Sequence, residues 1–180
     1  MKYSIEKVIK WCESNLRPQF LFFYGAKTDL DQVGKECLSQ WYECDFTVDG
    51  IRYHTAEQYM MSEKALLFKE LYHYSLIMEE SSPKKCKDLG RLVSGFESTT
   101  WDNALREIIF HGYLGKFQSD IMLVDALLKT ENAVLIEASP YDGIYGAGMA
   151  ESDLLNPDGT LKVKPENWKN PKNGARATNH

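Results

Sequence analysis

The sequence predicts an α+β fold that is predominantly α-helical, with a small antiparallel β element near the N-terminus. Apolar residues recur at helical spacing in several long stretches, which indicates amphipathic helices. A single Asp49-Gly50 pair separates two short alternating runs, which is typical of a hairpin. No G-x-G-x-x-G motif follows a strand, and strands do not alternate with helices, so a Rossmann fold is disfavoured.

A length of 180 residues suits a single domain, 1–180, with a sizeable core over about residues 20–150. Residues 1–17 form an extra N-terminal element. Helical spacing of four residues predicts an amphipathic helix there: Ile5, Val8, Ile9 and Cys12. Residues 156–180 are polar and contain three prolines, so we expect a loop tail without a hydrophobic pattern of its own.

The first strand is expected over residues 20–24, an aromatic run that ends before Gly25. The polar residues 27–35 predict a loop. Residues 44–48 and 51–53 flank Asp49-Gly50 and predict a β-hairpin with a tight turn.

The periodicity then becomes helical. Thr55 is a good N-cap with Gln58 three residues later, as in a capping box, and a helix is expected over residues 56–68. A further helix begins at Pro83 and is closed or interrupted at Gly90. The helix expected over residues 101–117 should turn four residues inward: Leu105, Ile108, Ile109 and Leu114. The remaining patterns predict helices over 71–80 and 120–129, a strand or extended run over 134–138 and a loop over 139–149.

Composition excludes several function classes. The net charge of −5 and the pI near 5.4 argue against broad binding to nucleic acid, although a local basic pocket stays compatible with them. Four cysteines lack C-x-x-C spacing, and the four histidines form no ligand cluster, so we expect no metal and no other cofactor. We read the cysteines as reduced thiols. No apolar run is long enough to cross a bilayer, and the N-terminus is not a signal peptide. The sequence therefore predicts a cytoplasmic protein without a membrane partner.

The helix that begins after Thr55 carries the first candidate site. Glu57 lies in its first turn, where the helix dipole favours the ionised carboxylate. Lys64 follows seven residues later on roughly the same face, about 10 Å along the axis. The alternative is that Glu57 only complements the dipole and that Lys64 is solvated.

Two further segments are candidates. The run that ends in Asp142 is followed by Gly146 and Gly148, and such a loop can bring backbone N–H groups close to a phosphate or can simply be a turn. Gln40 and Trp41 precede the hairpin, where an aromatic ring beside an amide can stack on a flat base or can pack in the core.

These segments, in this order, resemble the YbiA-like family, also called NADAR. The resemblance covers roughly residues 20–150, and a weaker match follows at Pro165 and Trp168. The matching segments are Leu38-Ser39-Gln40-Trp41-Tyr42, Phe46-Thr47-Val48-Asp49-Gly50, Ala56-Glu57-Gln58-Tyr59-Met60-Met61, Lys64-Ala65, Leu89-Gly90-Arg91, Trp101, Lys116-Phe117 and Glu137-Ala138-Ser139-Pro140-Tyr141-Asp142.

The resemblance implies a mainly helical fold with a small β element and an N-glycosidase that hydrolyses the bond between ribose C1 and nitrogen. The implied substrates are small phosphoribosyl molecules of two classes. One is ADP-ribose on guanine, in nucleotides or in single-stranded nucleic acid. The other is an early ribosylamino-pyrimidine phosphate of riboflavin synthesis. A single flipped-out base suits an acidic protein better than a duplex does.

In the reaction, Glu57 and Asp142 are the candidate carboxylates that stabilise charge on the sugar, activate water or protonate the base. Lys64, or Lys27 in the loop after the first strand, could instead attack C1 and form a Schiff base. If neither attacks, Lys64 would pair with Glu57 or hold a phosphate. Arg91 could grip a phosphate or could be a surface arginine at a helix end.

The resemblance has two departures. Tyr145 stands where the family usually has Trp, and with Trp41 it is our candidate for stacking on the base or lining the ribose. Relatives commonly continue past Asn179 into an apolar helix, whereas this chain stops at His180, as a truncated chain or a variant without that helix would. These departures keep one rival open, a binding module that holds ADP-ribose or a nucleotide without turning it over. The amphipathic N-terminal helix keeps a second rival open, a structural or partner-binding helical domain.

Overall fold

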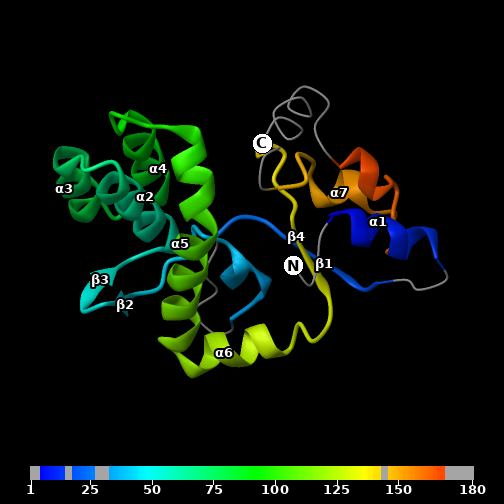
Figure 1. Ribbon diagram of the computed structural model, residues 1–180. Helices are drawn as coiled ribbons and strands as arrows, with labels where there is room; N and C mark the ends of the chain where they lie inside the picture. The colour runs from blue at the N-terminus through cyan, green and yellow to red at the C-terminus, as the bar shows by residue number, and fades with distance from the viewer. Residues whose placement is uncertain (1–4, 15–17, 27–32, 143–145, 169–180) are drawn as a thin grey trace. The chain divides into compact units, whose positions relative to one another are not determined.

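The computed structural model describes residues 5–14, 18–26, 33–142 and 146–168 (Figure 1). The chain forms two compact units, and each is described by itself. One unit comprises Met1–Gly25 and Thr130–His180, and the other comprises Ala26–Lys129. The predominantly helical class with a small antiparallel sheet is confirmed.

Helices α2 to α6 belong to the unit Ala26–Lys129. Its elements, in chain order, are the 3-10 helix η1 (Lys35–Leu38), β2 (Phe46–Val48), β3 (Ile51–Tyr53), α2 (Ala56–Leu67), α3 (Leu71–Glu79), α4 (Pro83–Leu92), α5 (Ser98–Gln118) and α6 (Ile121–Leu128). Helix α2 packs against α3, α4 and α5. The core between these helices consists of Met60, Met61, Ala65, Ile77, Cys86, Val93, Trp101 and Leu105. Helix α2 is therefore the central helix of this unit.

The hairpin is confirmed as β2 paired antiparallel with β3, with Val48 opposite Ile51. Asp49 and Gly50 both have positive φ, 50° and 82°, as a tight turn of this kind requires. Tyr53 of the hairpin packs edge-to-face on Tyr59 of α2, with ring centroids 5.0 Å apart. The hairpin is thereby fixed to the first turns of α2.

Two details of the helices differ from the sequence-based expectation. Gly90 lies inside α4, which continues to Leu92. A side chain at this position would meet Met61, whose Sδ lies 2.1 Å from where a Cβ would stand, so Gly90 permits close packing of α4 on α2. Leu114 is 41% exposed, not inward. It lies nine residues from Leu105, two and a half helical turns, and hence on the opposite face of α5.

The other unit contains α1 (Ile5–Glu13), β1 (Phe20–Phe23), β4 (Val134–Glu137), α7 (Glu151–Leu154) and the 3-10 helix η2 (Pro165–Asn167). The expected N-terminal helix and both short strands are confirmed. The strands β1 and β4 pair in parallel, with Phe20 opposite Val134.

Residues 156–168 are mostly loop, with the short 3-10 helix η2, and they contain one buried aromatic residue. Trp168 is 3% exposed and packs edge-to-face on Phe20 and Phe22, with ring centroids 5.4 and 5.9 Å away. Its indole Nε1 donates to the Val163 carbonyl at 2.9 Å. Trp168, together with Leu161 and Val163, packs this otherwise polar segment into the core of the unit.

Candidate functional site

Glu57 and Trp41 meet at the start of α2. Glu57 is 1% exposed, and its Oε2 accepts a hydrogen bond from the Trp41 indole Nε1 at 3.2 Å. The Glu57 backbone N–H donates to the Gln40 carbonyl at 3.0 Å. This N–H is one of the first donors of the helix, which have no partner within α2. The structure thus brings three of the predicted site residues, Gln40, Trp41 and Glu57, into one cluster, which we call the Glu57 cluster.

The N-terminus of α2 is held by its own sequence. The Thr55 side chain accepts from the Gln58 N–H at 3.1 Å, so the N-cap is confirmed. The Gln58 side chain accepts from the N–H of His54, one residue before the capping-box position, at 2.8 Å. Its Nε2 donates to the carbonyls of Ile77 and Glu80 at 3.0 and 2.9 Å.

Gln58 is a residue whose importance the sequence pattern understates. It is buried, and it ties the first turn of α2 to the end of α3 and to the turn before α4. The carboxylate one residue earlier, Glu57, therefore sits on backbone that is fixed from two sides. The sequence marks Gln58 only by its spacing from Thr55 and by its place in the matching segment of residues 56–61.

Trp41 has a second neighbour on α4. The Lys87 Nζ lies 5.9 Å from the Trp41 ring centroid, within cation–π range. Gln40 points its Nε2 at the Met60 sulfur, at 3.6 Å. The ring of Trp41 is partly buried, so it is neither a core aromatic nor a freely exposed one.

The structure places Lys64 away from the Glu57 cluster, in the last turn of α2. Its Nζ donates to the Gly90 carbonyl at 2.8 Å and lies 4.4 Å from the Phe96 ring centroid and 5.6 Å from that of Trp101. Burial, helped by the nearby Arg91 charge, lowers the pKa of Lys64. A lowered pKa is what an attacking amine requires, and the hydrogen bond to Gly90 is what it would have to release.

Arg91 lies at the surface of α4. Its side chain is 67% exposed and pairs with Asp88 at 3.3 Å, which fits a surface arginine at a helix end. Lys27 and Tyr145, the two other sequence candidates, lie outside the described residues.

Asp142, Gly146 and Gly148 belong to the unit that contains β1 and β4, in the loop after β4. A side chain at Gly146 would bring a Cβ within 2.7 Å of the Asp142 carbonyl oxygen, and Gly148 has a φ of 69°. The Gly148 N–H donates to the Asp142 carbonyl at 3.1 Å, and the Ala147 N–H donates to that of Glu137 at 2.8 Å. These glycines are explained by the loop's own fold, since its N–H groups at 147 and 148 are already engaged.

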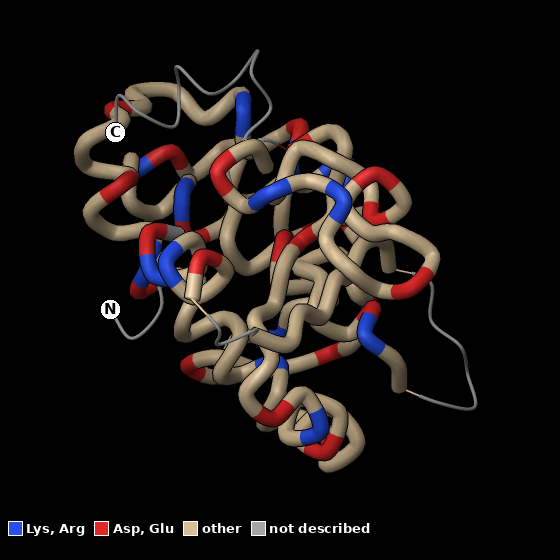
Figure 2. Tube along the Cα trace, turned by 90° about the vertical axis from the view of Figure 1, so that its right-hand side faces the viewer, with Lys and Arg blue, Asp and Glu red and all other residues tan. Residues whose placement is uncertain are grey.

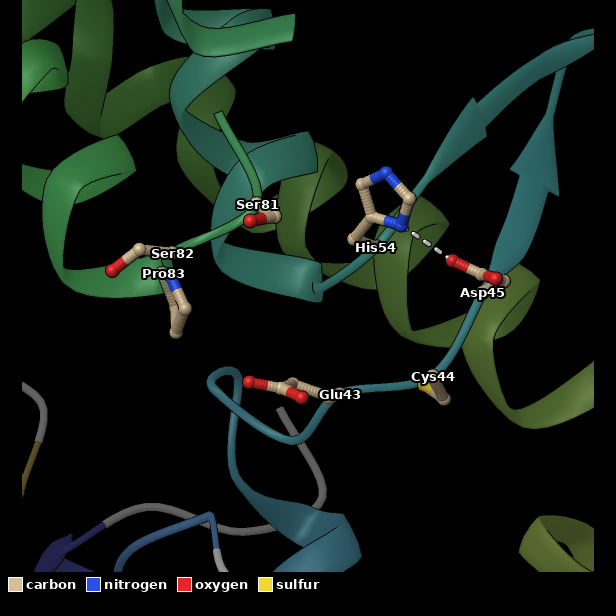
Figure 3. Close-up of a pocket in the computed structure, with 7 residues that line it drawn as sticks. All are labelled: Glu43, Cys44, Asp45, His54, Ser81, Ser82 and Pro83. Carbon is tan, nitrogen blue, oxygen red and sulfur yellow. Dashed lines mark hydrogen bonds and ion pairs between the residues drawn. The ribbon is translucent and has the colours of Figure 1, made fainter. Parts of the chain in front are cut away.

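A pocket of about 480 Å³ lies beside the hairpin in the same unit as the Glu57 cluster. Figure 3 shows its lining residues, which are Glu43, Cys44, Asp45, His54, Ser81, Ser82 and Pro83. The His54 Nδ1 lies 2.6 Å from Asp45, which also pairs with Arg52, and these two partners lower the pKa of Asp45, Arg52 most. Neither Glu57 nor Trp41 lines this pocket, so the pocket and the cluster are separate features.

The charges are mixed along the chain. Figure 2 shows acidic and basic positions interspersed along the described residues. In the same ranges, no group of three His, Cys, Asp or Glu side chains could hold a metal ion. None of the helices in the described residues has both the length and the apolar character to cross a membrane.

Comparisons with known proteins agree on one family. The NADAR domain model matches residues 22–171. An N-glycosidase of Acanthamoeba polyphaga mimivirus is 39% identical over 143 residues, which cover 77% of this chain and 83% of that protein. An N-glycosidase of Nostoc punctiforme is 26% identical over 134 residues, covering 74% and 86%. The NMR structure of the E. coli protein YbiA has a TM-score of 0.62 at 20% identity, covers 91% of this chain and 90% of that one, and thus shares the fold.

Proposed function

Because this chain belongs to the NADAR family, as its ordered motifs predicted, we propose that it is an N-glycoside hydrolase that cleaves the bond between ribose C1 and a nitrogen base. Two relatives that match most of the chain are named N-glycosidases. The observation that carries the proposal is the buried Glu57 carboxylate, held by the Trp41 indole at the N-terminus of α2.

The chemistry needs such a carboxylate. As the bond from C1 to nitrogen breaks, positive charge develops on C1 and on the ring oxygen, and the electron pair leaves with the base. A fixed carboxylate stabilises this charge and can take a proton from the water that adds to C1, while the leaving nitrogen receives a proton. Trp41 and the Glu57 backbone contact to Gln40 hold the carboxylate in one orientation before substrate arrives.

The proposed substrates carry a ribose next to a 5′-phosphate. They are ADP-ribose linked to guanine, in nucleotides or in single-stranded nucleic acid, and the ribosylamino-pyrimidine phosphates. The partly buried ring of Trp41 supports recognition of a flat base, because aromatic stacking tolerates either class. Asp142 stays a second candidate carboxylate, supported by its family motif.

The test is base release by the purified protein from both substrate classes. Glu57→Gln keeps the shape of the side chain and removes its charge, and we expect base release to fall by about a hundredfold or more. Glu63→Gln, a carboxylate change six residues further along α2, is the matched control and should leave the rate nearly unchanged. Asp142→Asn in the same assay tests the second carboxylate.

The outcomes distinguish a hydrolase from a nucleotide-binding module. Release from one class, lost in Glu57→Gln and kept in Glu63→Gln, supports the hydrolase and names its substrate. Binding of ADP-ribose without release from either class favours the nucleotide-binding module instead. Equal rates in wild type and Glu57→Gln would remove Glu57 from the reaction.

A further inference from the structure

Lys116 is a lysine buried in the core of the unit Ala26–Lys129, on the last turn of α5. It is 0% exposed, and three aromatic rings surround its ammonium group. The Nζ lies 5.3 Å from the ring centroid of Tyr42, 5.5 Å from that of Tyr113 and 5.6 Å from that of Phe117. It donates a hydrogen bond of 2.6 Å to the Ser39 carbonyl. Because removing a charged lysine from water is unfavourable, a role for the buried position of Lys116 has to be found.

Helix α5 holds the segment before the hairpin at two successive carbonyls. Tyr113 lies three residues before Lys116 and hence on the same helix face. Its hydroxyl donates to the Leu38 carbonyl at 2.9 Å, and Lys116 donates to the next carbonyl, that of Ser39. The Ser39 hydroxyl in turn accepts from the Trp41 N–H at 3.2 Å. Two side chains of α5 thereby fix the backbone from which Trp41 projects.

The turn of residues 39–41 also contacts the start of α2. One residue after Ser39, the Gln40 carbonyl accepts from the Glu57 N–H, and Trp41 bonds the Glu57 carboxylate. An unbroken series of contacts thus runs from Lys116 through the turn of residues 39–41 to Glu57. Every contact in it lies within one compact unit.

We propose that Lys116 is a positioning residue of the Glu57 cluster: its hydrogen bond to Ser39 holds the turn that presents Gln40 and Trp41 to the Glu57 carboxylate. The importance of this position for catalysis rests on the proposed hydrolase function, whereas the geometric effect does not. Lys116 itself is enclosed and does not touch substrate. The lowered pKa of Lys116, which burial causes, agrees with an amine held inside a core.

The test compares Lys116→Met with a core change that cannot act through Ser39. Met has nearly the shape of the lysine stem and keeps the packing against the rings, but it cannot donate to the carbonyl. Leu105→Ala, on the same helix but in the core cluster with Met61 and Ile77, is the destabilising control. Both are assayed well below their unfolding temperatures.

Two measurements report on the geometry without any substrate. The indole N–H resonance of Trp41, identified by its loss in Trp41→Phe, should shift in Lys116→Met and stay in place in Leu105→Ala. The Glu57 amide, which bonds Gln40, should exchange its hydrogen faster only in Lys116→Met. In the activity assay, kcat should fall by about tenfold or more, with a smaller change in KM, because the carboxylate is misplaced rather than removed.

An unshifted Trp41 indole, an unchanged Glu57 amide and a kcat within about twofold of wild type would show that Lys116 only fills space, and would overturn the proposal. If Lys116→Met does not fold, Tyr113→Phe removes only a hydroxyl and tests the neighbouring carbonyl of Leu38 by the same readouts. A wild-type protein that releases no base would refute the proposed function, and the two NMR measurements would still decide the positioning role.

Discussion

The buried ammonium of Lys116 predicts a contribution to stability that increases as the pH rises into the alkaline range. Burial lowers the pKa of Lys116 from 10.5 to about 8 in the folded protein. In the unfolded chain the amine returns to its ordinary pKa. Between these two values the unfolded chain binds a proton that the folded protein does not, so stability from this group rises with pH through that window.

The magnitude follows from the two pKa values. At about pH 7 the amine is largely protonated in both states, so the pH-dependent gain in stability has hardly begun. By about pH 9.5 the linkage relation gives roughly 2 kcal/mol of added stability from Lys116 alone.

Neighbouring groups act in the opposite direction. The pKa values of the Cys37 and Cys44 thiols, which face Lys116, are raised by burial, and that of Tyr42 is raised for the same reason. A group whose folded pKa is raised loses stability as its unfolded form ionises, so these groups lower stability above about pH 9. The difference between wild type and Lys116→Met removes the part of their contribution that does not depend on Lys116. The charge of Lys116 itself lowers the pKa values of both thiols, so that part of their contribution stays in the difference.

The assay is urea unfolding followed by circular dichroism, for both proteins at about pH 7 and pH 9.5. Wild type should gain roughly 2 kcal/mol relative to Lys116→Met between the two conditions. Parallel changes in the two proteins would mean that the folded protein carries the charged amine without penalty, and the reasoning from burial would be refuted.

Three further predictions follow from single contacts. Gly112→Ala would place a Cβ 2.5 Å from Tyr59 Cδ1, so thermal unfolding should show a loss of about 1–3 kcal/mol although alanine favours helices; an unchanged or higher melting temperature would contradict the close packing of α5 on α2. Gln58→Leu removes the donor to the Glu80 carbonyl and should cost about 1–3 kcal/mol, with faster amide exchange at the start of α4; protection equal to wild type would show that Gln58 does not tie α2 to that turn. Borohydride with ribose phosphate should trap an adduct on Lys64 if its amine attacks C1, and mass spectrometry that finds the peptide unmodified under turnover would leave the carboxylate route.

Local structure could be predicted from the sequence where neighbouring residues determine it. Thr55 caps α2 with its own hydroxyl, and Asp49-Gly50 has the positive φ values that such a tight turn requires. Pairing over long separations could not be predicted in the same way. The parallel contact of β1 with β4 joins segments more than a hundred residues apart, and neither strand's residues specify that partner. The buried Trp168 likewise packs on a distant segment, the β1 residues Phe20 and Phe22.

The same distinction between local and long-range determinants applies to the candidate site. Glu57 and Trp41 could be named from their motifs, but the bond between them needs the hairpin segment and α2 to be packed together. Lys116 could not be assigned a role at all, because a lysine on a helix is usually at the surface. Its burial is decided by three aromatic residues and a carbonyl that lie up to 77 positions away in the chain.

Glu57, Gln58 and Lys116 are all buried polar side chains in one small unit, and such groups seldom give the most stable core. Apolar residues of similar volume avoid the cost of removing a charge from water. At neutral pH, where folded Lys116 is largely charged, Lys116→Met should therefore lose little stability or gain some, while the turn of residues 39–41 loses its anchor. A variant that is as stable as wild type but slower in base release would show that the chain keeps this lysine for the geometry of the Glu57 cluster. A variant that loses stability and activity in proportion would show the opposite, namely that the lysine holds the fold and affects the site only through it.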